Sequence, residues 1–370
     1  MYQYIFFGST QPPYARGEYI ADGRYTSVVN QADNTTARAQ VLLTQIPSTV
    51  PGGVDFLGGL NILRASPFGS VDAFKTYHGA YAQDNWRVSP KLTLNYGLRL
   101  DIINPQTVNG AQKGGFLLMS VNGQQIDITS PDIRVAGVSG IGLNGDVKNT
   151  LNWAPRVGVA YQLTEKTVLR TGYGRSYDLG VFGSVFGHTV TQNLPVLSAQ
   201  ALNAPENFAA VFNLKDGPSP PVFPAVPSNG LLRLPDGVFA RALPDTQHPP
   251  AVDAYNVTVQ RELTSDISVE AAYVGNHGAR VFVGDGPAVN GNQPRLDGFP
   301  TVPTDLRKPY FTRYGWTQGI DVFCNCGTNR YDSLQTKLTK RFSKGYSVFA
   351  QYTLQRERQH GGDQFFYLPD

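Results

Sequence analysis

Four pairs of alternating segments, each pair joined by a very short turn, constrain the fold of this chain most strongly. The pairs occupy residues 76–101, 154–177, 254–275 and 331–355, and apolar and polar residues alternate along them with one exception, Phe349. A period of two is that of a β-strand with one apolar and one polar face. The chain is therefore predicted to be all-β and built from antiparallel hairpins.

The spacing across the turns indicates the register of each hairpin. An apolar-face residue precedes every turn, and the chain returns to that face four positions later. The four steps are Val88 to Leu92, Leu163 to Thr167, Leu263 to Ile267 and Phe342 to Tyr346. Because a shift of one residue would exchange the two faces, the repeated spacing predicts a specified register.

The connections between the hairpins are of a different kind from the turns. They run over 101–154, 177–254 and 275–331, roughly 50 to 75 residues each, and are rich in Gly, Pro, Asn and Asp. Short turns at one end and long loops at the other are typical of a transmembrane β-barrel of the outer membrane. No run of about 18 apolar residues exists, so a transmembrane helix is not predicted.

A secreted β-sandwich is the main alternative fold, because its strands also alternate. Two features disfavour it. The predicted strands have about 10 residues, whereas five or six is usual. The aromatic residues are also sorted by depth: Trp86 and Tyr346 lie close to a turn, while Tyr255 and Tyr352 lie six to ten residues from one. These positions match the two edges of an apolar band about 25 Å tall.

Composition and motifs give no indication of an enzyme or of a nucleic-acid partner. The net charge is only +3, and the basic residues are scattered. The five histidines fall at no metal-ligand spacing, and the glycine-containing segment GYGRSYDLG has no phosphate-binding pattern. Because no nucleophile, base and orienting acid can be matched, no catalytic, cofactor or metal site is predicted.

Charged residues on the polar faces of the hairpins are predicted to line the lumen of a barrel. An Arg or Lys at the middle of the lipid-facing side would cost about 2 to 4 kcal/mol. The predicted lumen-lining residues are Lys91, Arg99, Asp101, Arg156, Arg170, Glu262, Glu270, Lys337 and Arg341. Two cysteines, Cys324 and Cys326, fall in the last long connection, and both a disulfide and a pair of reduced thiols remain open.

Four segments of the chain resemble the barrel of Oar-like TonB-dependent receptors. They are YAQDNWRVSPKLTLNYGLRLD, NWAPRVGVAYQLTEKTVLRTGYGRSYD, AYNVTVQRELTSDISVEAAYVGNHGARV and NRYDSLQTKLTKRFSKGYSVFAQYTLQ, in this order from about Thr76 to about Gln355. The resemblance implies a barrel of 22 antiparallel strands in the outer membrane of a Gram-negative bacterium. It also implies an N-terminal plug and a TonB box that couples uptake to the proton gradient.

The resemblance implies a domain organisation as well. Residues 1–75 would add two to four strands, such as EYIADGRYTSVV and ARAQVLLTQI, and residues 76–356 would form the four hairpins with long extracellular loops. Residues 357–370 would be a loop-like truncated end. We therefore expect about 10 to 12 barrel strands, without the plug, and an internal fragment, since the first residues lack the pattern of a signal peptide.

The leading functional prediction is the barrel wall of a transporter that takes up a bulky ligand across the outer membrane. The expected partners are outer-membrane lipid, the TonB complex through the missing N-terminal part, and the ligand itself. Siderophore, glycan, peptide and cobalamin-like ligands all remain open. The alternatives are a small self-contained barrel with an adhesin or structural role and a secreted β-sandwich binding module.

Overall fold

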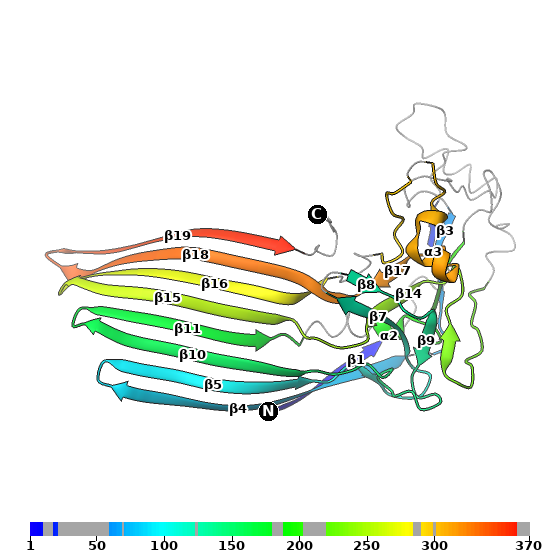
Figure 1. The fold of residues 1–370 in the computed structure, drawn as a ribbon, viewed down its shortest axis with the longest axis horizontal. Coiled ribbons are helices and arrows are strands. Elements are labelled where there is room, and N and C mark those ends of the chain that lie inside the picture. The colour runs from blue at the N-terminus through cyan, green and yellow to red at the C-terminus, as the bar shows by residue number, and fades with distance from the viewer. Residues whose placement is uncertain are drawn as a thin grey trace.

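A single long antiparallel sheet forms the main body of the molecule (Figure 1). The computed structural model describes residues 1–9, 18–20, 59–68, 70–122, 125–179, 188–202, 220–283, 290–298 and 301–360. In spatial order, the strands of the sheet are β1 (Tyr2–Ser9), β4 (Val71–Ser89), β5 (Leu92–Ile103), β10 (Leu151–Thr164), β11 (Thr167–Tyr177), β15 (Ala251–Thr264), β16 (Ile267–Val283), β18 (Cys324–Ser343) and β19 (Tyr346–His360). A short tenth strand, β6 (Thr107–Val108), pairs with β4.

The four predicted hairpins are confirmed as β4–β5, β10–β11, β15–β16 and β18–β19. The described strands form one continuous sheet with β1 and β19 at its ends, and they do not close into a ring. This arrangement matches the predicted partial barrel wall. The β-sandwich alternative is not supported, because these hairpins do not divide into two packed sheets.

A β-bulge directly before each turn explains why the apolar face returns after four positions. The register shifts between Gln162 and Thr164 in one hairpin and between Glu262 and Thr264 in another, and the same shift precedes the other two turns. The extra residue of a bulge opposes no partner. Each connection thus consists of a two-residue turn and one bulged residue. The next residue on the apolar face therefore comes four positions after the last one, and each strand keeps its apolar and polar faces.

The strands extend further toward the loops than the sequence pattern predicts. β4 has 19 residues and β18 has 20, whereas about 10 were expected. β18 begins at Cys324, so the two cysteines lie at the start of a strand and not within a loop. β19 continues to His360, so part of the expected loop-like end at 357–370 is strand, and residues 361–370 lie outside the described residues.

The first strand, β1, was not predicted, because its two faces are both apolar. Tyr4 and Phe6 lie on one face, while Ile5 and Phe7 pack against a buried cluster that includes Val108. The predicted strand EYIADGRYTSVV contains β2 (Glu18–Ile20), which pairs with β3 (Gly59–Ala65). With β12 (Ser198–Leu202) these two strands form a separate sheet of three strands. The predicted strand at 37–46 lies outside the described residues.

The long connections fold together at the end of the sheet opposite the turns (Figure 1). We call this unit the loop cap and define it as the described parts of 104–150, 188–250 and 290–323, apart from β6 and β12. Its elements are β7 (Gly115–Asn122), β8 (Gln125–Asp127), β9 (Asp132–Val135), α2 (His188–Thr191), β13 (Leu231–Arg233), β14 (Ala240–Pro244), η2 (Asp305–Arg307), α3 (Pro309–Tyr314) and β17 (Ile320–Val322). Its six-stranded sheet has the order β13-β9-β7-β14-β17, with β8 beside β7.

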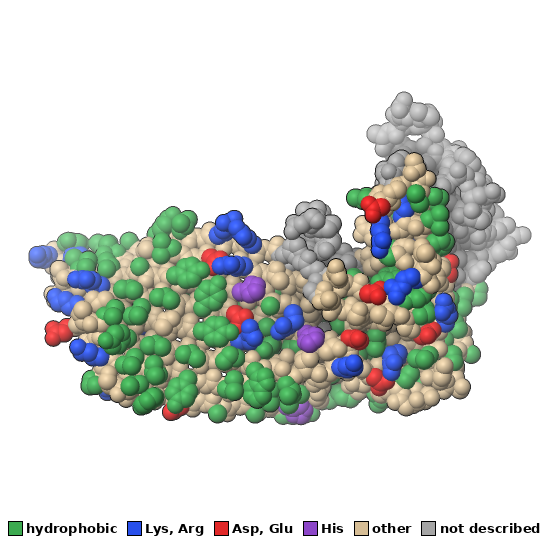
Figure 2. Space-filling view, viewed as in Figure 1, with side chains coloured by type: hydrophobic (Ala, Val, Ile, Leu, Met, Phe, Trp, Pro, Cys, Tyr) green, Lys and Arg blue, Asp and Glu red, His purple; other side chains and the backbone are tan. Residues whose placement is uncertain are grey.

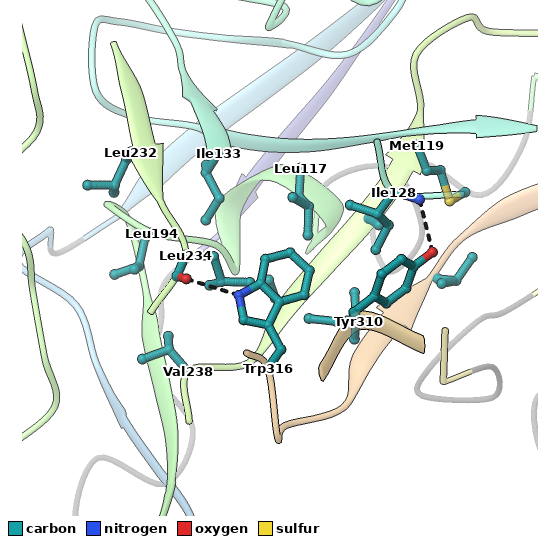
Figure 3. Close-up of a cluster of buried hydrophobic side chains, with 14 of the residues drawn as sticks. Leu117, Met119, Ile128, Ile133, Leu194, Leu232, Leu234, Val238, Tyr310 and Trp316 are labelled. Carbon is teal, nitrogen blue, oxygen red and sulfur yellow. Dashed lines mark hydrogen bonds between the residues drawn. The ribbon is translucent and has the colours of Figure 1, made fainter. Parts of the chain in front are cut away.

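The loop cap has a hydrophobic core of its own (Figure 3). Trp316 lies at its centre, 1 % exposed, and its indole nitrogen donates a hydrogen bond to the carbonyl of Leu234 at 3.1 Å. The hydroxyl of Tyr310 accepts a hydrogen bond from the backbone of Ile128 at 2.9 Å. These contacts join segments from all three long connections, so the connections form one folded unit.

The long sheet carries its hydrophobic side chains on a face that is open to the surroundings. The register aligns Tyr96 with Val157, Val157 with Tyr173 and Tyr173 with Tyr255 across neighbouring strands. Val157 is 51 % exposed and Leu354 is 59 % exposed. Figure 2 shows hydrophobic side chains spread over the sheet. A continuous apolar surface of this kind is what contact with lipid requires.

Candidate functional site on the polar face of the sheet

Most of the predicted lumen-lining residues lie on the face of the sheet opposite the apolar one. The register places Arg99 opposite Ala154, Arg156 opposite Gly97 and Gly174, and Glu270 opposite both Gln260 and Lys337. Arg170 follows the same alternation, and Glu262 and Arg341 extend this face toward the turns. Lys91 is the exception, because it lies in the turn after β4.

Asp101 is the most deeply buried of these residues. Its carboxylate, 1 % exposed, accepts hydrogen bonds from the hydroxyl of Tyr77 at 2.6 Å and from Nε of Arg99 at 2.9 Å. The side chain of Asn152 donates to the carbonyl of Asp101 at 3.1 Å, and Gln247 of the loop cap donates to the carbonyl of Ile103. This network joins the sheet to the loop cap and satisfies a buried charge.

The other charged residues of the polar face make local contacts across the strands. The guanidinium of Arg170 donates to the side-chain carbonyl of Gln260 at 2.7 Å. Glu270 and Lys337 stand directly opposite each other on β16 and β18, where opposite charges stabilise strand pairing. The backbone of Arg341 donates to the carbonyl of Asp266 in the neighbouring turn. The polar face therefore carries charges of both signs, with more cations than carboxylates.

A hollow of about 560 Å³ lies over the middle strands, where side chains are small. Two rows of the polar face meet there, and both contain glycine. One row passes through Gly97, Arg156 and Gly174, and the other passes through Gly158 and Gly172. Asn95, Asn256 and Asn276 supply amide groups around it. The hollow can accept a polar surface at close range, because little side-chain volume stands between it and the backbone.

The turns and the loop cap contain the titratable groups that lie outside the strands. Hydrogen bonds from the hydroxyls of Ser343 and Thr264 lower the pKa of Asp266 in its turn. A backbone hydrogen bond from Gly142 lowers the pKa of Asp146, and Arg134 adds to the effect. Burial raises the pKa of Tyr310 in the core of the cap. The hydrogen bonds that lower the pKa of Asp266 and of Asp146 stabilise a turn and a loop, whereas burial keeps Tyr310 neutral.

The region where the sheet meets the loop cap contains the two cysteines of the chain. Cys324 and Cys326 are joined in a disulfide at the start of β18, where Cys324 belongs to the core of the loop cap. Among the described residues, no group of three or more His, Cys, Asp or Glu could hold a metal ion. No helix within the same residues has the length and apolar character needed to cross a membrane.

The residues that build the loop cap were not predicted from the sequence. Trp316, Tyr310 and Asn292 come from a connection without a repeating pattern. Asn292 donates to the carbonyls of Trp316 and Gln318 and accepts from the backbone of Tyr310, all within 3.0 Å. Four aromatic residues within seven positions, Tyr310, Phe311, Tyr314 and Trp316, were the available signal of this core.

A sheet with one apolar and one polar face, short turns at one end and folded loops at the other defines the wall of a membrane β-barrel. The model of the outer membrane beta barrel domain matches residues 1–367. The chain therefore belongs to the outer membrane β-barrel domain family, and its location is the cell outer membrane.

Several solved structures are similar to this chain at low sequence identity. The ferric-catecholate import receptor Fiu from E. coli K12 is 13 % identical, with a TM-score of 0.35 over 80 % of this chain and 29 % of that one. The alcaligin outer membrane receptor FauA from Bordetella pertussis is 11 % identical, with a TM-score of 0.34 over 81 % and 33 %. The transporter YddB from Escherichia coli is 8 % identical, with a TM-score of 0.35 over 85 % and 37 %.

This chain thus spans about a third of the length of these solved chains. The comparison with curated proteins gave no match.

Proposed function

We propose that this chain is a segment of the barrel wall of a TonB-dependent receptor, which takes up a bulky ligand across the outer membrane. In this proposal the sheet forms part of the conduit, and the loop cap contributes to ligand capture at the cell surface. The energy for uptake enters through a plug and a TonB box outside this chain. The Oar-like resemblance of the four hairpins supports this assignment.

One structural observation carries the proposal. Ten strands form the sheet, and its two end strands, β1 and β19, remain unpaired with each other among the described residues. The diameter of a barrel grows with its number of strands, and barrels of about eight strands are filled by their own side chains. In this proposal further strands join the two ends of the sheet, and the lumen is then wide enough to hold a plug or to pass a ligand.

The charged residues of the polar face have a defined role in this proposal. Arg99, Asp101, Arg156, Arg170, Glu262, Glu270, Lys337 and Arg341 line the lumen, where both signs of charge suit contact with water and with a polar plug. The hollow around Arg156 is the place where such a plug can approach the wall most closely, because glycines surround it. The ligand class remains open among siderophore, glycan, peptide and cobalamin-like molecules.

Uptake by cells tests this function directly. Cells with and without the gene for this chain, each with and without a working TonB protein, would be given radiolabelled ferric catecholate, cobalamin, a maltodextrin or a peptide. We expect accumulation of one probe to require both the gene and TonB. Equal uptake of every probe with and without the gene would contradict the proposal. A gene-dependent uptake that persists without TonB would also contradict it.

Two variants test whether uptake depends on the polar face of the sheet. Arg156→Ala, in the hollow, should lower uptake several-fold, because it removes the cation that lines the hollow among the described residues. Arg87→Ala, on the same face beside a turn, serves as the matched control and should leave uptake unchanged.

A further inference from the structure

Three arginines share the apolar face of the last hairpin, near the end of the sheet that joins the loop cap. The register of β18 and β19 places Arg330 directly opposite Arg358, and Asp332 directly opposite Arg356. These positions continue the alternation of Leu334 and Leu354, which stand opposite each other on the same face. The three guanidinium groups are therefore presented on the side of the sheet that faces lipid.

The charges in this patch do not balance. Asp332 accepts a hydrogen bond from Nε of Arg330 at 2.7 Å and also accepts from the hydroxyl of Tyr273. Arg356 and Arg358 form no ion pair with a carboxylate among the described residues. Like charges that stand directly opposite on neighbouring strands destabilise the pairing. An anion from outside the chain would remove this repulsion between Arg330 and Arg358.

The height of the arginines in the membrane indicates which anion reaches them. A tilted strand climbs about 2.5 Å per residue, so the three side chains lie roughly 25 to 33 Å above the turn between β18 and β19. The apolar band of such a barrel is about 25 Å tall. The arginines thus lie at its outer edge, where lipid headgroups begin.

Tyrosine hydroxyls also meet carboxylates on the same face of β11 and β15. The hydroxyl of Tyr173 donates to Asp253 at 2.6 Å, and that carboxylate also binds Arg175 at 2.7 and 2.8 Å. Interfacial tyrosines of barrels have their rings in the apolar band and their hydroxyls toward water. Figure 2 shows charged and histidine side chains gathered where the broad hydrophobic surface gives way toward the cap.

We propose that Arg330, Arg356 and Arg358 form a binding site for the phosphate groups of a lipid in the outer leaflet of the membrane. The guanidinium fork matches phosphate oxygens in a bidentate manner. Leu334, Leu354 and Tyr352 lie below the arginines on the same face and would contact the acyl chains. An apolar surface directly beneath the cations favours a lipid headgroup over a free phosphate ion. The site does not depend on the transport function proposed above.

Lipid retention measured by native mass spectrometry tests this site. The purified full chain in detergent would be mixed with phosphatidylcholine or with diphosphorylated lipid A, and the bound lipids would be counted. The variant Arg356→Gln/Arg358→Gln would be compared with Arg87→Gln/Lys166→Gln, which removes the same charge at the turns. Circular dichroism would establish that each variant retains its strands.

We expect the wild-type chain to retain lipid A in preference to phosphatidylcholine. Since each Arg or Lys near a membrane surface contributes about 1 kcal/mol to the binding of anionic lipid, the double variant at 356 and 358 should retain lipid A about thirtyfold more weakly. The control variant should behave as the wild type.

Two results would overturn the site. Equal retention of the two lipids by the wild-type chain would show that phosphate charge is not recognised. This comparison of the two lipids needs no variant. Loss of bound lipid A in a modest excess of inorganic phosphate would assign the arginines to a free anion and not to a lipid.

Discussion

Trp316 shows at the scale of a residue how the loop cap is held together. Its ring lies 5.9 Å from that of Tyr310 and 4.8 Å from that of Tyr314, both of the third long connection, and its nitrogen binds Leu234 of the second. Leu117 of the first connection belongs to the same core. The side chain of Trp316 therefore lies in a core to which all three long connections contribute.

Replacing Trp316 by Ala should destabilise the loop cap by about 3 to 5 kcal/mol, because the change removes a fully buried aromatic ring and leaves a cavity. Amide hydrogen exchange in β7 and β14 should become about a hundredfold faster, or more. Leu296→Ala, at a position that is 85 % exposed, is the control and should leave the exchange unchanged. Unchanged protection in the Trp316 variant would show that the cap does not depend on this core.

Asp146 gives one loop of the cap a dependence on pH. A hydrogen bond from the backbone of Gly142 lowers its pKa below the ordinary value, and so does Arg134. A carboxyl group whose pKa is lowered by folding stabilises the folded state above its unfolded pKa and loses this effect as the pH falls through the folded pKa. The loop is therefore expected to loosen below about pH 4.

A spin label at Leu143, which is partly exposed, would report this loosening. Its mobility should increase between pH 6 and pH 3 in the parent chain. In Asp146→Asn the label should be mobile at both pH values, because the amide does not titrate. The same pH response in both chains would assign the transition to another group.

At the scale of an element, the two faces of a single strand differ in the side chains that they tolerate. Val257 and Asn256 are neighbours on β15, and the register places Val257 opposite Tyr273 on the apolar face and Asn256 opposite Val274 on the other. Both lie near the middle of the band that the hairpins span. Their side chains therefore differ mainly in the face on which they lie.

Val257→Lys should lower the free energy of unfolding in a bilayer by about 2 to 4 kcal/mol, because it brings a charge into contact with lipid. Asn256→Lys, one position away, should change it by less than about 1 kcal/mol, because lumenal positions admit charge. Equilibrium unfolding in urea in lipid vesicles measures both values. An equal cost at the two positions would mean that neither face contacts lipid.

The hairpins were predictable from sequence, because strand alternation and turn chemistry are local signals. The apolar alternation of β10 or β15 requires no knowledge of the rest of the chain. β1 was missed because Ile5 and Phe7 are covered by the loop cap while Tyr4 and Phe6 face outward, so neither face is polar. The full length of β4 was missed because Val71 and Ala73 pack beneath the same cap.

At the scale of the whole molecule, the loop cap could not be predicted from local patterns. Its strands are three to eight residues long, and their partners come from distant connections: β14 pairs with β7 on one side and with β17 on the other. The positions of the charged residues on the polar face could be predicted, whereas the hollow near Arg156 requires the register of several strands at once.

The pairing of β14 between β7 and β17 also determines the order of assembly. Ala242 pairs with Leu117 on one side and with Val322 on the other. Contacts that are so far apart in sequence form late, because the intervening chain must first be ordered. The sheet of the cap is therefore complete only after residue 322 has been synthesised and the hairpins between these segments have brought their ends together. We therefore expect the loop cap to be the last part of this chain to fold.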